Sequence, residues 1–307
     1  MKSRRQLTRV LTCICSGAML AVLCVPASAQ AAERKVLCEQ FTATWCSWCP
    51  YVGEAHGQMI DQYPGTWVGF QIHCADAYAF TWGTQRKSYY TIGTYPTYML
   101  DGIVREEGSE GTSVPANKAL MISHMETRLA VPTDVSLELG GEKISGQTFR
   151  FVAKVTLDDT SAARTVRFYM IHAQDHYPTS AAHDRNCARQ AADYVDLDLE
   201  PGVPQLVEHE FTFSSAYWDA KQNIRIIAWV QKKLTSKEIA NAEMISYPFP
   251  VPPVDLPEDL TGDGTVDVLD LVTLLGFWGE CDGCAADLNK DGVVDVVDLL
   301  TLIAAWS

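Results

Sequence analysis

The sequence predicts a multidomain protein in which an α/β domain is followed by a β-sandwich and then by a small all-α module. Three observations support this fold class: a Cys-x-x-Cys motif after a short apolar stretch, alternating hydrophobicity after Val131, and an acidic loop that occurs twice near the end of the chain. At 307 residues the chain is long enough for two or three domains. The predicted segments are a signal peptide at 1–29, an α/β domain at 33–130, a β-sandwich at 131–248, a proline-rich linker at 249–257 and a small calcium-binding module at 258–307.

The N-terminus has the features of a secretory signal peptide. Four basic residues precede an apolar stretch at 11–25 and a small-residue cleavage site that ends at Ala29. The apolar stretch is too short and interrupted for a membrane span, and a lipid anchor at Cys24 is the less favoured alternative. Cleavage changes the net charge from -14 to -18, because it removes four basic and no acidic residues. Such an acidic chain repels nucleic acid and anionic lipid. Because of the predicted signal peptide, we expect the protein to be secreted, periplasmic or located on the cell surface.

The segment 45–50, Trp-Cys-Ser-Trp-Cys-Pro, follows a predicted buried strand at 36–41 and predicts a redox-active cysteine pair. At the start of a helix, unpaired N–H groups favour the thiolate of Cys46, which is the form that attacks a disulfide, and we expect Cys46 alone to be exposed. Cys49 is then placed to resolve the mixed disulfide. The alternatives are half of a zinc site or a structural clip, but zinc normally needs four ligands and no second such motif lies nearby.

The surrounding residues resemble thioredoxins over residues 33–130. Val36–Cys46 is similar to the first core strand and active-site entry, Trp67–His73 to a second strand, and Tyr90–Gly102 to a third strand with its entry. The resemblance implies that Pro96 follows a cis peptide bond and faces the cysteines, and that protein thiols or disulfides are the substrates. It also implies a buried Asp six residues before the first cysteine, where this chain has Gln40. The adjacent Glu39 should point to the opposite face of the strand.

Residues 131–248 predict a β-sandwich, because several segments alternate apolar and polar residues and no strong helix interrupts them. These segments are 149–157, 165–171, 206–213 and 224–231. An α/β domain followed by such a segment resembles a family of bacterial outer-membrane-associated thioredoxin-fold proteins, and Lys237–Ala242 is similar to the closing strand of that family.

The remaining cysteines and histidines give weaker signals. Cys74 and Cys187 could form a bridge between the two domains, with Cys38 left as a buried thiol, but the connectivity is not readable from sequence. A cluster of potential ligands between positions 172 and 187 matches no standard metal spacing, and its centre reads as a surface loop. We therefore expect no metal there. The cluster consists of His172, Asp175, His176, His183, Asp184 and Cys187.

After the extended linker, a twelve-residue loop that starts at Asp259 recurs at Asp287, 28 positions later. Positions 1, 3, 5 and 12 supply oxygen ligands, position 7 supplies an oxygen such as its carbonyl, and Gly at position 6 permits the turn, which is an EF-hand-like pattern for Ca²⁺. The first loop contributes Asp259, Thr261, Asp263, Thr265 and Asp270, and the second contributes Asp287, Asn289, Asp291, Val293 and Asp298. Cys281 and Cys284 lie between the loops and read as a structural clip.

Each loop leads into one short amphipathic helix, and the two apolar stripes are expected to bury each other. The stripes are Leu271, Leu274, Leu275 and Trp278, and Leu299, Leu302, Ile303 and Trp306. Loop-then-helix, twice, resembles the dockerin module and implies a cohesin-like or cell-surface partner. In cellulosomal dockerins, Ser/Thr pairs at loop positions 10 and 11 help to recognise cohesin, and here the pairs are Val268-Leu269 and Val296-Val297.

Two functions remain open. One is a secreted thiol–disulfide oxidoreductase in which Cys46, Cys49 and Pro96 form the catalytic site and a calcium-binding, dockerin-like tail serves attachment or assembly. The other is a non-catalytic cell-surface binding or assembly protein that uses the thioredoxin-like domain as a scaffold. The intact cysteine pair favours the first function, and Gln40 with the large β-rich addition favours the second.

Overall fold

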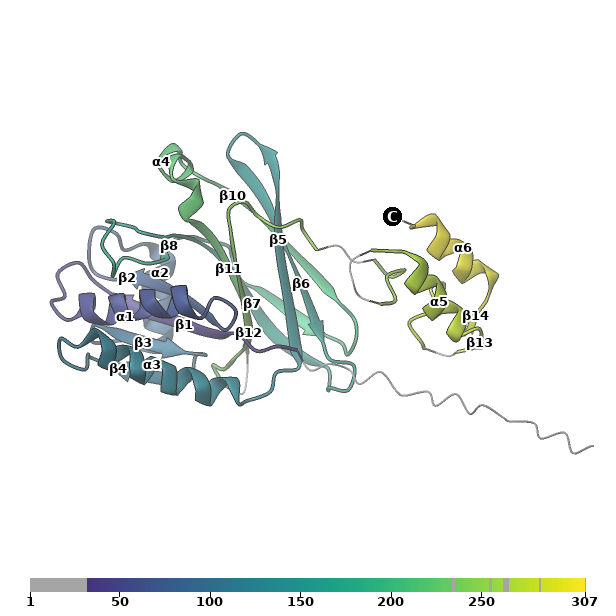
Figure 1. Cartoon of the computed structure of the whole chain (residues 1–307), viewed down its shortest axis with the longest axis horizontal. Helices are drawn as coiled ribbons and strands as arrows, with labels where there is room; N and C mark the ends of the chain where they lie inside the picture. The colour runs from purple at the N-terminus through teal and green to yellow at the C-terminus, as the bar shows by residue number, and fades with distance from the viewer. Residues whose placement is uncertain (1–31, 234–235, 254–255, 262–264, 282, 307) are drawn as a thin grey trace, which may run out of the picture. The chain divides into compact units, whose positions relative to one another are not determined.

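Strands from most of the chain form one nine-stranded mixed sheet in the computed structural model (Figure 1). The structure describes residues 32–233, 236–253, 256–261, 265–281 and 283–306, so the predicted signal peptide and Asp263 lie outside the described residues. The strand order is β12-β11-β7-β8-β2-β1-β3-β4, with β9 paired to β7. The strands of this sheet are β1 Val36–Thr42, β2 Trp67–His73, β3 Thr97–Leu100, β4 Val104–Glu107, β7 Arg164–Gln174, β8 Cys187–Ala191, β9 Val195–Leu199, β11 Ile224–Lys232 and β12 Ile239–Ser246.

Three helices cover the β1–β4 end of the sheet. Helices α1 (Cys49–Gln62) and α3 (Val114–Leu129) pack on one face, where Met59 and Met121 meet Trp67 in a buried cluster. Helix α2 (Thr81–Tyr90) covers the other face with its aromatic side chains. Strand β1 is buried on both sides, as expected for a strand between two helical layers.

The other end of the large sheet packs against a second sheet of three strands, in the order β10-β6-β5. These strands are β5 Val135–Ser145, β6 Thr148–Leu157 and β10 Gln205–Thr212. The largest buried cluster lies between the two sheets, where Phe151 of β6 packs with Phe168 of β7 and Ile226 of β11. The alternating pattern of the sequence produces this face, because every second residue of β6 points inward. A short helix α4 (Ser215–Asp219) and a 3₁₀ turn (Lys221–Asn223) precede β11.

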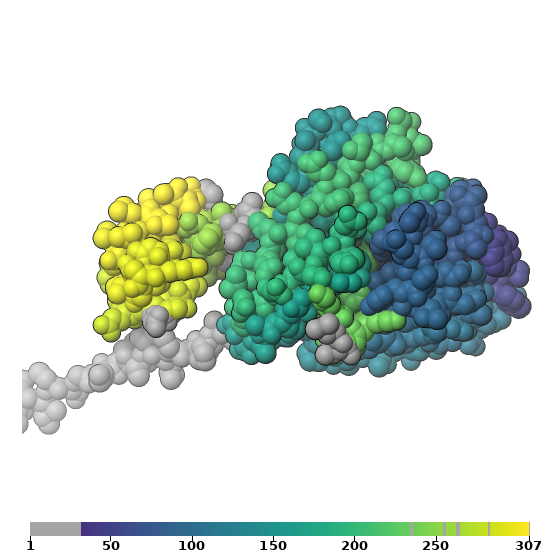
Figure 2. Space-filling model, turned by 180° about the vertical axis from the view of Figure 1, so that it is seen from behind, coloured from purple at the N-terminus to yellow at the C-terminus, as the bar shows by residue number. Residues whose placement is uncertain are grey.

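The predicted fold class is wrong, because the α/β part and the sandwich do not form separate folds. Strand β8 pairs in parallel with β2 through Gln71 and Cys187, and β7 continues the same sheet. One buried cluster accordingly joins Phe70 of β2 to Tyr169 and Trp229 of the later strands. Figure 2 shows the blue and green segments packed directly against each other. This continuity was missed because no strand was predicted at Cys187–Ala191, whereas this strand pairs with the edge of β2.

The C-terminal module, taken by itself, also corrects the predicted fold class. Helices α5 (Val268–Gly276) and α6 (Val296–Ala304) are present, but the two-stranded sheet of β13 (Gly279–Glu280) and β14 (Val293–Val294) means that the module is not all-α. Leu274 of α5 and Leu302 of α6 are fully buried in the same hydrophobic cluster. The second halves of both predicted stripes are about half exposed, which contradicts the expectation that they bury each other. These exposed residues are Leu275, Trp278, Ile303 and Trp306.

The proline-rich segment after β12 begins in contact with the three-stranded sheet. Phe249 packs edge-on against Phe151, with ring centroids 4.8 Å apart, and the N–H of Gly141 donates to the carbonyl of Pro250 at 2.9 Å. Gly141 lies next to Gly140, where a Cβ would stand only 2.2 Å from the carbonyl oxygen of Val251. The absence of a side chain on Gly140 therefore allows this segment to lie directly on β5.

Candidate functional site

The Cys-x-x-Cys motif lies between β1 and the first residue of α1, and its cysteines form a disulfide. The N–H of Cys49, which starts the helix, donates to Cys46 Sγ at 3.1 Å. Pro50 occupies the first turn, where its missing N–H costs no hydrogen bond. Because a helix N-terminus favours negative charge, this geometry favours a thiolate on Cys46 when the pair is reduced.

Both sulfur-bearing residues are more enclosed than we expected from sequence. Cys46 is 8% exposed and Cys49 is 4% exposed, so the expectation of an exposed Cys46 is wrong for this disulfide state. The exposed residues of the segment 45–50 are Trp45, Ser47 and Trp48. The peptide bond between Tyr95 and Pro96 is cis, and Tyr95 packs against the small buried cluster of Ala43, Cys46 and Cys49.

A pocket of about 210 Å³ opens beside the disulfide. Its walls come from the end of β1 and the motif, from the end of β2, and from the loop between β7 and β8. That last loop belongs to the segment that the sequence assigned to a different domain. The lining residues are Thr42, Ala43, Thr44, Cys46, Cys49, Pro50, His73, Tyr78, Pro178, Thr179, His183 and Asp184.

One pocket-lining residue, His73, is paired with an aspartate behind it, and the sequence did not single out this pair. His73 Nδ1 lies 2.7 Å from Asp76 Oδ2, and both side chains are at most 3% exposed. The carboxylate also accepts the backbone N–H groups of Thr44 at 2.8 Å and Tyr78 at 2.9 Å. Burial alone would raise the pKa of Asp76, but the hydrogen bonds from His73, Thr44 and Tyr78 hold it below its usual value. The sequence did contain a signal for this pair, because His73 is a polar residue at the carboxyl end of a predicted buried strand, and the cysteine motif follows the carboxyl end of the neighbouring strand β1.

Gln40 and Glu39 point to opposite faces of β1, which confirms the expectation from strand geometry. Gln40 is fully buried and accepts a hydrogen bond from Gln71 at 3.3 Å. Glu39 binds Arg86 of α2 at 2.6 and 2.9 Å, and also accepts from Tyr90. Glu39 is therefore held in an ion pair on the far side of the strand from the cysteine pocket.

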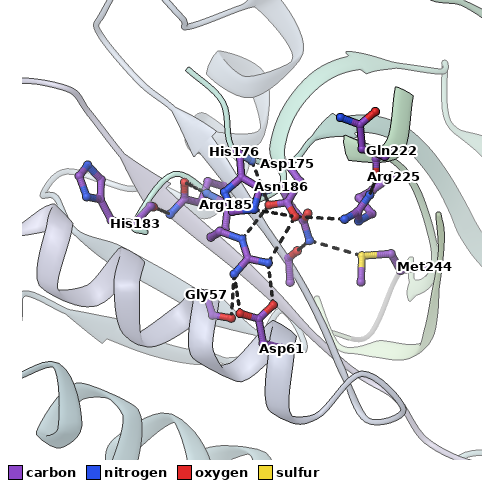
Figure 3. A network of polar contacts seen from close by, with 12 residues as sticks. Gly57, Asp61, Asp175, His176, His183, Arg185, Asn186, Gln222, Arg225 and Met244 are labelled. Carbon is purple, nitrogen blue, oxygen red and sulfur yellow. Dashed lines mark hydrogen bonds and ion pairs between the residues drawn. The ribbon is translucent and has the colours of Figure 1, made fainter. Parts of the chain in front are cut away.

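Of the histidine- and aspartate-rich cluster at 172–187, Asp175 lies at the centre of a network of ion pairs (Figure 3). Asp175 accepts from Arg185 at 2.7 Å and from Arg225 at 3.1 Å, and Arg185 also binds Asp61 of α1 at 2.8 and 2.9 Å. His172 is packed between aromatic rings, and burial lowers its pKa to about 3. Within the described ranges no group of three or more potential metal ligands is found. This network joins the β7–β8 loop to α1.

The bridge between Cys74 and Cys187 that we considered does not form. Cys38, Cys74 and Cys187 are all buried thiols. Burial raises the pKa of Cys74 to about 11 and that of Cys187 to about 12, so neither is an activated nucleophile. Cys281 and Cys284 form the second disulfide, at the predicted clip.

The position-12 carboxylates of the two predicted calcium loops make matching contacts with the described residues of each loop. Asp298 is fully buried, and its carboxylate accepts the N–H groups of Leu288, Asn289 and Asp295 at 2.8 to 3.1 Å. Asp270 does the same in the first loop for Thr261 and Asp267. Each of these carboxylates is also part of a capping box that starts the following helix. For both, burial would raise the pKa, but the backbone N–H groups lower it.

The donor set of the second loop fits Ca²⁺, because it consists of carboxylate, amide and carbonyl oxygens. Asp287 accepts the N–H of Gly292 at 2.8 Å, and the side-chain oxygen of Asn289 accepts the N–H of Asp291 at 3.0 Å. Gly292, at loop position 6, has φ +89°, a conformation that side chains disfavour. In the first loop, the Thr261 hydroxyl donates a hydrogen bond to the Asp259 carboxylate at 3.3 Å.

Residues 257–306 match the Dockerin type I domain, a calcium-binding module that assembles proteins by binding cohesins. No curated protein matches the chain. Among solved structures, HBP35 of Porphyromonas gingivalis is 15% identical over 74% of this chain and 79% of its own, with a TM-score of 0.57, so the two share a fold.

Two shorter structural likenesses carry no argument on their own. A domain of the outer membrane lipoprotein Omp28 from Porphyromonas gingivalis is 10% identical, with a TM-score of 0.28 over 40% of this chain and 92% of its own. Thioredoxin of Malassezia sympodialis is 16% identical, with a TM-score of 0.25 over 32% of this chain and 79% of its own. The dockerin module fits an extracellular or cell-surface location. Among the described residues, no helix has the length and apolar character needed to cross a membrane.

Proposed function

We propose that the chain is a secreted thiol–disulfide oxidoreductase that its dockerin module attaches to a cohesin-like or other cell-surface partner. The observation that carries the redox assignment is the Cys46–Cys49 disulfide, which lies at a helix N-terminus beside a pocket. Cys46 is the nucleophile, Cys49 the resolving thiol, and Pro96, after its cis bond, shapes the place where the substrate chain lies.

The chemistry is a two-electron exchange. The Cys46 thiolate attacks one sulfur of a substrate disulfide, and the other substrate sulfur leaves as a thiolate. Cys49 then attacks Cys46 Sγ, which releases the second substrate sulfur and leaves the protein disulfide. The direction of electron flow depends on the reduction potential, which is about -270 mV in a thioredoxin and about -120 mV in a strong oxidant.

Alkylation of the reduced mature protein at pH 6 tests this proposal. We expect Cys46 to react much faster than Cys38, because Cys46 receives the Cys49 N–H whereas burial raises the pKa of Cys38 well above its usual value. Cys46→Ser should abolish disulfide-reductase activity. Cys281→Ser with Cys284→Ser is the matched control and should retain it. Equal alkylation rates for Cys46 and Cys38, or an active Cys46→Ser variant, would show that the catalytic assignment is wrong.

The second candidate is a non-catalytic surface protein that uses the same fold as a scaffold. It is favoured by Gln40, which replaces the acid expected before the motif, and by the low exposure of Cys46. A protein of this kind would carry the disulfide but show no turnover with any disulfide substrate, so the same assay separates the two functions.

The module's partner surface is proposed to lie at positions 10 and 11 of the two loops. All four residues are roughly half exposed although they are apolar: Val268, Leu269, Val296 and Val297. Since apolar residues here replace Ser/Thr pairs, we expect binding to a cohesin with a complementary apolar face. Binding measured against a panel of cohesins, with calcium or with chelator, tests this.

A further inference from the structure

We infer that His73 is the proton-transfer residue of the Cys46–Cys49 site and that Asp76 positions its ring. The inference rests on the proposed function and assigns a role to a pair that the cysteine motif does not contain. Cys49 is 4% exposed, and a thiol must lose its proton before its sulfur attacks a disulfide, so Cys49 requires a proton acceptor inside the pocket.

Gln40 does not meet that requirement. Gln40 is fully buried on the same face of β1 as Thr42, which lines the pocket. Its amide, however, neither gains nor loses a proton in the pH range where thiols react. Glu39 faces the other way and is held by Arg86. The nearest carboxylates and imidazoles must therefore come from other elements of the pocket.

His73 meets it by position. In the parallel pairing of β1 with β2, His73 is the register partner of Thr42, so both lie at the strand ends from which the pocket is built. His73 lines the pocket together with both cysteines. The loop after β2 is also tied to the motif's own turn, because Thr44 donates to Asp76 at 2.8 Å and the Trp45 indole N–H donates to the carbonyl of Ala75 at 3.0 Å. These bonds fix the imidazole relative to the cysteines.

The hydrogen bond to Asp76 sets the tautomer. An ionised carboxylate only accepts, so His73 Nδ1 must carry the hydrogen that lies between them at 2.7 Å. In the neutral imidazole, Nε2 then bears the lone pair. This atom is buried and has no hydrogen-bond partner in the part of the chain that the structure describes. A buried base with an unused lone pair is what the resolving thiol requires.

In the reducing direction, the Cys49 S–H proton moves to His73 Nε2 while the Cys49 sulfur attacks Cys46 Sγ. The bond between Cys46 and the substrate sulfur breaks, and that sulfur leaves with the electron pair. It takes the proton from His73, so the substrate is reduced by two electrons and the cysteines are oxidised to the disulfide.

Other charged or titratable groups also face this site and belong in any account of its pH dependence. Tyr78 packs edge-on against the His73 ring at 5.5 Å, and His183 and Asp184 line the pocket from the β7–β8 loop. His183 is 3.6 Å from Asp184 and its side chain is 39% exposed. The pH dependence of the reaction can therefore be assigned to His73 only by comparing the wild-type profile with that of a His73 variant.

The test follows the reduced mature protein as it reacts with Ellman's reagent, which releases one thiol anion when Cys46 attacks and a second when Cys49 resolves. We expect His73→Gln to leave the first release within about two-fold of wild type and to slow the second about 100-fold at neutral pH, the usual size of a lost general base. Imidazole in the buffer should restore part of the second release to His73→Ala. The control His124→Gln alters a histidine of α3 that is hydrogen-bonded to Tyr98, outside the pocket, and should change neither release.

Asp76→Asn should slow the second release less than His73→Gln, and the double variant should be no slower than His73→Gln, because the two residues act as one unit. A second release that stays within two-fold of wild type in His73→Gln would overturn the inference. So would equal slowing of both releases together with a lower melting temperature, which would indicate a structural role. If the wild type shows no fast first release from Cys46, the proposed function itself fails, and the role of His73 fails with it.

Discussion

Asp175 shows how single residues hold the pocket loop in place. Its side chain is 3% exposed and accepts from two guanidinium groups, those of Arg185 and Arg225. Arg185 in turn reaches Asp61 and the carbonyl of Gly57 on α1 (Figure 3). Burial would raise the pKa of Asp175, but these cations lower it. One carboxylate thus connects the β7–β8 loop, β11 and the helix that begins at Cys49.

Asp175→Asn should destabilise the protein by about 3–5 kcal/mol, the usual cost of leaving buried cations uncompensated. Because the folded pKa of Asp175 lies below its unfolded value of about 3.9, its contribution is complete above that pH and is lost as the pH falls through the folded pKa. The variant should therefore lose less stability than wild type on acidification. Urea unfolding at several pH values measures this, with the exposed Asp219→Asn as control. A difference below 1 kcal/mol at neutral pH would contradict the prediction.

At the level of residues, the sequence identifies what a local motif encodes and misses what folding brings together. Cys46 and Cys49 are three positions apart in one turn, and Pro96 was found through a resemblance, so their placement needed no tertiary information. His73 becomes a neighbour of the motif only through the register of β1 with β2. The position of Asp184 depends on β8 joining the sheet, which no local pattern reveals.

Among the elements, the duplicated loop and helix is the unit that the sequence defined most clearly. Both copies start their helix with an Asp–Asp capping box at matching positions, Asp267 with Asp270 and Asp295 with Asp298. What periodicity could not supply was the short β13–β14 pairing or the outward direction of half of each apolar stripe. Periodicity gives the face on which a side chain lies, but the curvature of a two-helix core decides how much of that face is covered.

Calcium should protect the second loop from trypsin, because bound cation offsets the repulsion among its carboxylates and closes it. Lys290 is the single Lys or Arg from Asp255 onward, so cleavage there reports on this loop alone. In the full chain, we expect slow cleavage at Lys290 with calcium and fast cleavage with chelator.

Asp298→Ala should remove that protection, since it deletes the carboxylate that holds three backbone N–H groups of the loop. Asp270→Ala, the equivalent change in the first loop, should reduce protection less. Mass spectrometry of the fragments gives the rates. Cleavage at Lys290 that does not depend on calcium, or that is unchanged by Asp298→Ala, would count against calcium-coupled folding.

Across the whole molecule, the sheet shared by early and late segments determines what can fold alone. Phe70 is covered by Trp229, with ring centroids 5.6 Å apart, and the β2 edge is paired by β8. A chain that ends at residue 130 would expose both. The linear order of patterns suggested two domains, because alternation and helix signals change near Val131 while strand partners are not written in the local sequence.

We expect the fragment that ends at residue 130 to aggregate or to lack fixed tertiary structure, since it exposes an open strand edge and large aromatic side chains. A chain that ends at residue 253 keeps both sheets and should fold. Near-ultraviolet circular dichroism and size-exclusion chromatography distinguish the two. A monomeric, well-packed 33–130 fragment would show that the shared sheet is not required.

Because the β7–β8 loop forms one wall of the pocket, the pocket is complete only after this late segment has been synthesised and has folded. A chain is made from its N-terminus, so Cys46 and Cys49 emerge long before Pro178 and Asp184 exist. Contacts between such distant segments form late. For the proposed oxidoreductase, we expect the cysteine pair to be accessible to other thiols during that interval, including the chain's own Cys38 and Cys74, until the late strands complete the pocket. For the proposed oxidoreductase, the docking of β8 is therefore the step at which the cysteine pair gains its complete pocket.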